Sequence, residues 1–207
     1  VNKITLEDVI AYYNNNFSPS VASMVVVGDL TREQVLEKTA FLKKWQNKKV
    51  VRSLPPAPKY EGKTTVFFVD KTKAAQTEFR IGQPSIPYDA YGDYYKSTLM
   101  NFTLGGGFSS RINLLIREEK GWAYNAYGFF RGGKYDGTWT AFAGIRADAS
   151  DSALVEFMKT IKGFREGGIT EKELEFTKNS IGQSDALKYE QAQQKAMFLS
   201  RILDYNL

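Results

Sequence analysis

The order of strand-like and helix-like segments after residue 62 constrains the fold of this chain more than any other feature. Patterns typical of strands occur there in two sequential pairs, and helical periodicity follows each pair. Strands that are neighbours in sequence usually pair antiparallel, and helices then cover one face of the sheet. The pattern therefore predicts an α+β fold, a mostly antiparallel sheet with helices packed on one face. It disfavours a doubly wound nucleotide-binding fold.

The individual elements follow from local patterns of apolar residues, turn residues and caps. Strands are predicted over 64–69, 75–81, 123–131 and 138–146, with the members of each sequential pair as neighbours in the sheet. Helices are predicted over 88–103, 109–120 and 150–165, and a last long helix from residue 170 towards 201. Gly121 is placed to end the second helix, and Thr170 with Glu173 has the spacing of a capping box for the last one.

The first fifty residues have a separate helix–strand–helix pattern. Thr5 with Asp8, and Thr31 with Gln34, have the spacing of N-terminal caps ahead of two helices. Between them, the Val-rich run 22–27 predicts a buried strand. A proline-rich segment without apolar periodicity comes next, which is typical of a linker. We therefore expect three parts, namely residues 1–52, a linker over 53–62, and residues 63–207.

Two absent residue types limit the chemistry of the chain. Its 207 residues include no histidine and no cysteine. The chain therefore cannot by itself form a Ser-His-Asp triad, a Cys-His dyad, a two-histidine zinc helix or a thiolate metal site. We expect no metal site in this chain. A metal held by carboxylates alone, or by another polypeptide, stays open.

The net charge of the chain suggests a nucleic-acid partner, but the distribution of its basic residues argues against one. There are 28 Lys and Arg against 23 Asp and Glu, a net charge of +5. The basic residues gather only between residues 43 and 52, which is more typical of a solvated helix end than of a nucleic-acid patch. No run of 18 apolar residues occurs, so we expect neither a nucleic-acid partner nor a membrane span. The absence of cysteine is compatible with a cytosol or an oxidising compartment, and we favour a bacterial periplasm or cell envelope.

The run LGGGFSS at 104–110 is rich in glycine and precedes a predicted helix. Backbone amides in such a run can bind an anion. The run, however, follows a helix and lacks the lysine of a phosphate-binding loop. A sharp turn between two helices, with Ser109 or Ser110 as the next cap, is the simpler interpretation.

Acidic residues in the predicted helices do not form a catalytic pair. Glu118 and Glu119 are adjacent, so on a helix their side chains point about 100° apart and cannot flank one bond. We expect both to be exposed. We expect the same of the acidic residues in the first turns of the last helix, Glu171, Glu173 and Glu175.

Arg117 and Tyr124 lie on either side of Gly121, at the end of a predicted helix and the start of a predicted strand. Both side chains donate hydrogen bonds, and together they can hold a carbonyl oxygen and the negative charge that grows on it during acyl transfer. From the local sequence alone, a surface ion pair for Arg117 and a half-buried Tyr124 is the simpler interpretation. The nearby aromatic residues Tyr127, Phe129 and Phe130 are expected to belong to the core of the sheet.

The stretch LGGGFSSRINLLIREEKGWAYNAYGFF, residues 104–130, resembles the second half of the M16 zinc metallopeptidases, the family of pitrilysin, insulin-degrading enzyme and the mitochondrial processing peptidases. The glycine turn, Ser-Ser-Arg, Arg-Glu-Glu and Gly-x-Ala-Tyr occur in the order and spacing of that family. The stretch TLEDVIAYYNNNFSPSVASMVVVGDL resembles the end of the preceding M16 domain. The resemblance implies that residues 1–52 end one M16-type domain and residues 63–207 form the next, whose last segment is expected to be missing.

The resemblance also implies a division of labour between two halves. In the family, one half carries the inverted zinc motif His-x-x-Glu-His, and the two halves close around an unfolded peptide. The other half contributes an Arg and a Tyr that reach the substrate carbonyl, and these correspond to Arg117 and Tyr124 here. This implies a zinc-bearing partner half, on the same chain or a separate subunit, and unfolded peptides as substrates. The chain alone is expected to be inactive.

Two other functions stay open. The first is a non-catalytic scaffold, as in the core subunits of respiratory complexes that share the fold. The second is a peptide- or nucleic-acid-binding module that acts alone, for which the basic pI is the only support.

Overall fold

The computed structural model describes residues 3–51, 56 and 62–207. The chain divides into two units, one comprising Val1–Pro56 and Ser184–Leu207, the other Ala57–Gln183. The predicted linker 53–62 lies outside the described residues, except for residues 56 and 62. The assignment of the parts to M16 domains stays a prediction.

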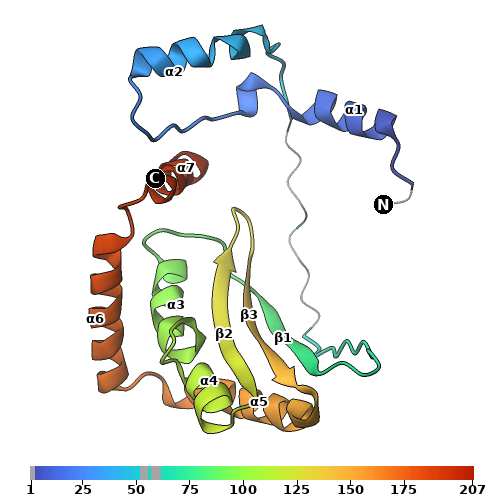
Figure 1. Ribbon diagram of the computed structural model, residues 1–207, viewed down its shortest axis with the longest axis vertical. Helices are drawn as coiled ribbons and strands as arrows, with labels where there is room; N and C mark the ends of the chain where they lie inside the picture. The colour runs from blue at the N-terminus through green and yellow to red at the C-terminus, as the bar shows by residue number, and fades with distance from the viewer. Residues whose placement is uncertain (1–2, 52–55, 57–61) are drawn as a thin grey trace. The chain divides into compact units, whose positions relative to one another are not determined.

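The second unit contains a three-stranded antiparallel sheet (Figure 1). Its strands are β1 (Gln76–Ser85), β2 (Ala123–Gly132) and β3 (Gly137–Arg146), and their spatial order is β1-β3-β2. The predicted pairing of the last two strands is confirmed, with Phe130 opposite Trp139. On its other side, β3 pairs with β1.

Two predicted strands are wrong. Residues 64–69 form no strand, and Val66, Phe67, Phe68 and Val69 are 80–89% exposed. Residues 22–27 form no strand either, and Met24 and Val26 are about half exposed. Apolar residues favour strands only where another strand satisfies the backbone, and among the described residues neither segment has such a partner.

The helices of the second unit cover one face of the sheet. Along β3, alternate residues are fully or almost fully buried, namely Trp139, Ala141, Ala143 and Ile145. Helix α5 (Ser150–Gly167) contributes Ala153, Phe157 and Phe164 to the same core. Helices α3 (Asp93–Asn101) and α4 (Arg111–Asn113) lie along β2 (Figure 1). The predicted α+β class, with helices packed on one face of an antiparallel sheet, is confirmed.

The opposite face of the sheet carries a separate aromatic group. The ring of Phe142 contacts those of Tyr127 and Phe129, with ring centroids 6.0 and 5.6 Å apart. Phe130 instead packs against the core. The expectation that all three predicted aromatics belong to the core is therefore correct only for Phe130, because side chains alternate between the two faces of a strand.

The glycine-rich run brings a helix into direct contact with β2. Helix α3 continues into a π-helical turn, η3 (Phe102–Gly106), in which a Cβ atom on Gly105 would lie 2.5 Å from the backbone nitrogen of Gly128. Nearby, the buried Asn101 donates from Nδ2 to the oxygen of Gly128 (2.6 Å) and accepts from Trp139 Nε1 (2.8 Å). The glycine-rich run therefore allows close contact between a helix and a strand. Ser110 is the N-cap residue of α4, as predicted, although its hydroxyl makes no capping hydrogen bond.

The first unit contains short helices whose predicted caps are confirmed. They are α1 (Leu6–Asn16), η1 (Pro19–Val21), α2 (Arg32–Lys38), η2 (Ala40–Lys44) and α7 (Ala192–Tyr205). Thr5 and Asp8 form a reciprocal capping box, and so do Thr31 and Gln34. The fully buried Ser18 donates to the backbone oxygen of Lys48 (2.6 Å). This hydrogen bond connects the residues after α1 with those after η2.

The predicted long helix after residue 170 is wrong because two helices take its place, α6 (Glu171–Leu187) and α7. Gln191 between them has an extended backbone. The rings of Tyr189 and Phe198 lie 4.9 Å apart. In one straight helix, nine residues would separate them by about 14 Å along the axis. The ring contact therefore requires the break.

Candidate functional site

Arg117 lies at the end of a second π-helical segment, η4 (Leu114–Glu119), which continues from α4. Two backbone hydrogen bonds close this end, from the amide of Gly121 to the oxygen of Arg117 (3.1 Å) and from Trp122 to Ile116 (3.0 Å). Gly121 has a φ of +62°, which favours glycine. The predicted helix end at Gly121 is therefore confirmed, and the chain enters β2 directly after it.

The side chain of Arg117 has two contacts. Its guanidinium carbon lies 4.5 Å from the ring centre of Phe108, a cation–π geometry. Its Nε lies 3.4 Å from Oε1 of Glu118, and the side chain is one-third exposed. The ion pair expected from the local sequence is therefore present. The aromatic platform under the guanidinium was not expected, because no spacing rule connects the glycine run to the end of the helix.

Tyr124 lies in a bulge of β2. Ala123 pairs with Ile145 and Ala126 with Ala143, so β2 has one extra residue between these pairs. Tyr124 is 90% exposed. The half-buried position expected from the local sequence is wrong, because the bulge interrupts the alternation that would turn this side chain towards a packed face.

Asn113 is a buried residue that sequence reasoning missed. Its Oδ1 accepts from the amide of Ala126 (2.9 Å), and its Nδ2 donates to the oxygen of Phe108 (2.7 Å). The residue is 0% exposed. Both partners lie outside the helix that carries Asn113, so no pattern within that helix indicates the role.

The junction between η4 and β2 thus presents two hydrogen-bond donors, Arg117 and Tyr124. Among the contacts of the described residues, none joins these two side chains to one another. The guanidinium of an arginine and the hydroxyl of a tyrosine are both hydrogen-bond donors, which is the chemistry that these two residues can supply.

The residues of this chain do not fit a zinc site. Within the described ranges, no group of three or more Asp, Glu, His or Cys side chains is arranged to hold a metal ion. The whole sequence contains neither histidine nor cysteine, the usual nitrogen and sulfur ligands of zinc. In the described part of the chain, no helix is long and apolar enough to span a membrane.

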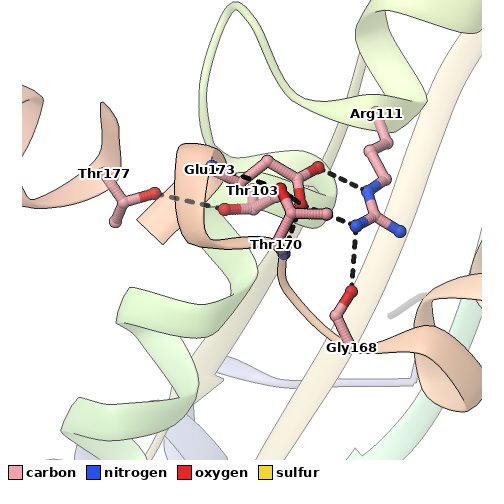
Figure 2. A network of polar contacts seen from close by, with 6 residues as sticks. All are labelled: Thr103, Arg111, Gly168, Thr170, Glu173 and Thr177. Carbon is pink, nitrogen blue, oxygen red and sulfur yellow. Dashed lines mark hydrogen bonds and ion pairs between the residues drawn. The ribbon is translucent and has the colours of Figure 1, made fainter. Parts of the chain in front are cut away.

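Arg111, in the Ser-Ser-Arg stretch, connects three helices (Figure 2). Its Nε and Nη2 donate to Oε1 and Oε2 of Glu173 in α6, at 2.6 and 2.7 Å. Nη2 also donates to the oxygen of Gly168 (2.9 Å), and the guanidinium carbon lies 4.9 Å from the ring centre of Phe164 in α5. This arrangement holds the α5–α6 turn against α4, and it belongs to the fold rather than to the junction of Arg117 and Tyr124.

The expected exposure of Glu173 is therefore wrong, although its predicted capping box with Thr170 is confirmed. The side chain of Glu173 is 27% exposed. The hydrogen bonds from Arg111 lower the pKa of Glu173 from 4.5 to about 2, and those from Thr170 act in the same direction. Glu118 and Glu119 are exposed, as expected.

This pKa predicts how acid destabilises the fold. Because the pKa of Glu173 is lower in the folded chain, its stabilisation is present above pH 4.5 and is lost as the pH falls through about 2. Glu173→Gln should lower the free energy of unfolding by about 1–2 kcal/mol at pH 6 and should flatten its decrease towards pH 2.5. Urea unfolding across this range measures both effects.

The matched control is Glu175→Gln, two residues further along α6, where the side chain is exposed. It should leave both the free energy of unfolding and its pH dependence nearly unchanged. Parallel pH curves for the wild-type chain and Glu173→Gln would contradict the assigned role of Glu173.

Comparisons with known proteins found one family and several relatives. The family model of the peptidase M16 inactive domain matches residues 3–181. A protein named non-peptidase homolog YmxG, from Helicobacter pylori, is 27% identical over 198 residues, which cover 92% of this chain and 44% of that protein. An uncharacterized zinc protease, YmxG of Bacillus subtilis, is 32% identical over 101 residues, which cover 49% of this chain and 25% of that protein.

A solved structure has the same fold. The crystal structure of the peptidase M16 inactive domain from Pseudomonas fluorescens matches with a TM-score of 0.79 and 23% identity, over 99% of this chain and 48% of that one. The chain thus spans less than half the length of these three proteins. Because the family model covers most of the chain, and the helices, sheet and fold agree with it, the chain belongs to the family of peptidase M16 inactive domains.

Proposed function

We propose that this chain is the non-zinc half of an M16 endopeptidase, and that Arg117 and Tyr124 donate hydrogen bonds to the substrate carbonyl. One observation carries the proposal. Tyr124 is 90% exposed, whereas Ala126 in the same strand is fully buried, so the fold makes little use of the Tyr124 side chain. An exposed phenol at the start of β2, seven residues after an arginine that lies on the ring of Phe108, is available for contact with another molecule.

The proposed chemistry divides between two halves. The partner half holds zinc, which activates water and polarises the carbonyl. When the halves close around the peptide, Arg117 and Tyr124 align the scissile bond and stabilise the negative charge on its oxygen.

The partners follow from the same proposal. The chain covers 44% of the Helicobacter pylori relative, which leaves room for a second half of similar size on the same polypeptide. A separate zinc-bearing subunit would serve equally. The substrates are unfolded peptides, because only an extended chain can present a backbone carbonyl to both halves. A periplasmic or envelope location stays a prediction.

A non-catalytic scaffold is the second candidate, and one specific observation favours it. The Helicobacter pylori relative is named a non-peptidase homolog. The two candidates differ in the other half of the parent protein. A His-x-x-Glu-His motif there, or in a partner subunit, supports the peptidase, and its absence from both supports the scaffold.

The direct test compares the isolated chain with the assembled enzyme. The chain alone should cleave no unfolded peptide in a fluorogenic assay with zinc present, because it lacks histidine and cysteine. Addition of the zinc-bearing half should produce hydrolysis that a chelator abolishes. Chelator-sensitive cleavage by the isolated chain would contradict the proposal, as would an assembled enzyme that is equally active without this chain.

A further inference from the structure

We infer that Asn113 is a positioning residue that fixes Arg117 and Tyr124 relative to one another. The inference rests on the proposed function, because it concerns the alignment of the same two donors. The side-chain amide of Asn113 makes two hydrogen bonds, one to Ala126 and one to Phe108. Ala126 follows the bulge that carries Tyr124, and the ring of Phe108 contacts Arg117. Asn113 itself is 0% exposed, so it acts only through Ala126 and Phe108.

The first hydrogen bond leads to Tyr124. Oδ1 of Asn113 accepts from the amide of Ala126, the residue at which β2 resumes its pairing after the bulge. Ala126 is 0% exposed, so water cannot replace this acceptor. Loss of the acceptor would leave a buried amide unsatisfied and would favour a shift of the bulge. Tyr124, two residues earlier, would move with it.

The second hydrogen bond leads to Arg117. Nδ2 of Asn113 donates to the backbone oxygen of Phe108 (2.7 Å). The ring of Phe108 is the platform for the guanidinium of Arg117, at 4.5 Å. Phe108 is 60% exposed, so packing alone holds it weakly. The hydrogen bond from Asn113 therefore fixes the backbone that presents this ring.

The amide of asparagine fits both demands because it carries a donor and an acceptor on one short planar group. Leucine has the same branched shape but supplies neither a donor nor an acceptor. Alanine also removes both ends of the amide, and it adds no volume to the core. Either substitution therefore breaks both connections.

Asn101 provides a matched control within the same fold. It is 3% exposed and also uses both ends of its amide, donating to Gly128 in β2 and accepting from Trp139. Its partners include neither Phe108 nor the bulge of β2. Substitutions at Asn101 should therefore cost a similar amount of stability without moving the two donors.

The experiment uses the complete peptidase, with its zinc-bearing half, and measures hydrolysis of an unfolded peptide. Asn113→Leu and Asn101→Leu should lower the thermal midpoint by similar amounts. Only Asn113→Leu should also lower kcat, by about tenfold or more with little change in KM, because misplaced donors affect the transition state more than substrate binding. In a Tyr124→Phe background, Asn113→Leu should lower kcat by a smaller factor, because one of the two donors is already absent.

The outcomes separate this inference from the proposed function. If Tyr124→Phe lowers kcat strongly but Asn113→Leu has no more effect than Asn101→Leu, Asn113 is merely structural and the proposed function stands. If Tyr124→Phe leaves kcat unchanged, the proposed function fails, and the inference fails with it. Should the leucine variants not fold, the pair Asn113→Ala and Asn101→Ala decides, because each removes both ends of the amide without adding volume to the core. A larger loss of kcat for Asn113→Ala supports the inference, and equal losses overturn it.

Discussion

Replacement of Tyr124 by Phe is expected to lower kcat of the assembled peptidase by about 100-fold or more, the usual cost of removing one donor to a developing oxyanion. The change removes only the phenolic hydroxyl. Because Tyr124 is 90% exposed, the thermal midpoint should stay unchanged. Steady-state hydrolysis of an unfolded peptide, together with thermal unfolding, separates loss of catalysis from loss of fold. KM should change little, since the donor acts mainly in the transition state.

Tyr91→Phe is the matched control for this prediction. Tyr91 is also strongly exposed, at 82%, and lies just before α3 rather than at the junction of η4 and β2. It should leave both kcat and the thermal midpoint unchanged. If Tyr124→Phe has near-normal turnover in an enzyme with a functional zinc site, Tyr124 is not a donor to the substrate carbonyl.

Replacement of Gly105 by Ala is expected to destabilise the fold strongly. The added Cβ would lie 2.5 Å from the nitrogen and 2.8 Å from the Cα of Gly128. Both are backbone atoms of the central part of β2, so they cannot rotate away as a side chain would. The helix and the strand would have to separate, at a cost of about 3 kcal/mol in the free energy of unfolding. Urea unfolding of the chain measures this loss directly.

Gly163→Ala is the control for this second prediction. Gly163 lies within α5, and apart from its chain neighbours and the backbone of its own helix, no atom lies within 4 Å of the position where its Cβ would be. Alanine is a better helix former than glycine, so this change should stabilise the chain by about 0.5–1 kcal/mol. Equal stability of Gly105→Ala and the wild-type chain would show that the contact with Gly128 is not close in solution.

The features predicted correctly from the sequence depend on interactions between residues that are close in the chain. The caps at Thr5, Thr31 and Thr170 join residues three apart. The helix end at Gly121 depends on a positive φ at one residue. The β2–β3 hairpin has four residues between its strands. In each case the interacting groups and the residues that bring them together lie within one short stretch.

Several incorrect predictions involve partners that lie outside the short stretch from which the pattern was read. Residues 64–69 have the composition of a strand, but β1, their predicted neighbour, pairs with β3 instead. Among the described residues, 64–69 has no strand partner. Glu173 has the pattern of an exposed first-turn acid, but it binds Arg111 from 62 residues earlier. The contact between Tyr189 and Phe198 breaks a helix that the local pattern continues.

The candidate site shows the same division. The sequence by itself determined the identity and spacing of Arg117 and Tyr124, the glycine between them and the absence of histidine and cysteine, because these are properties of the linear chain. Only the tertiary structure decided that Tyr124 stands exposed in a bulge, that Arg117 lies on Phe108, and that Asn113 is hydrogen-bonded to both supports. Those features depend on hydrogen bonds and ring contacts between elements. Such contacts form only when the helix packs on the strand and the buried backbone groups find partners.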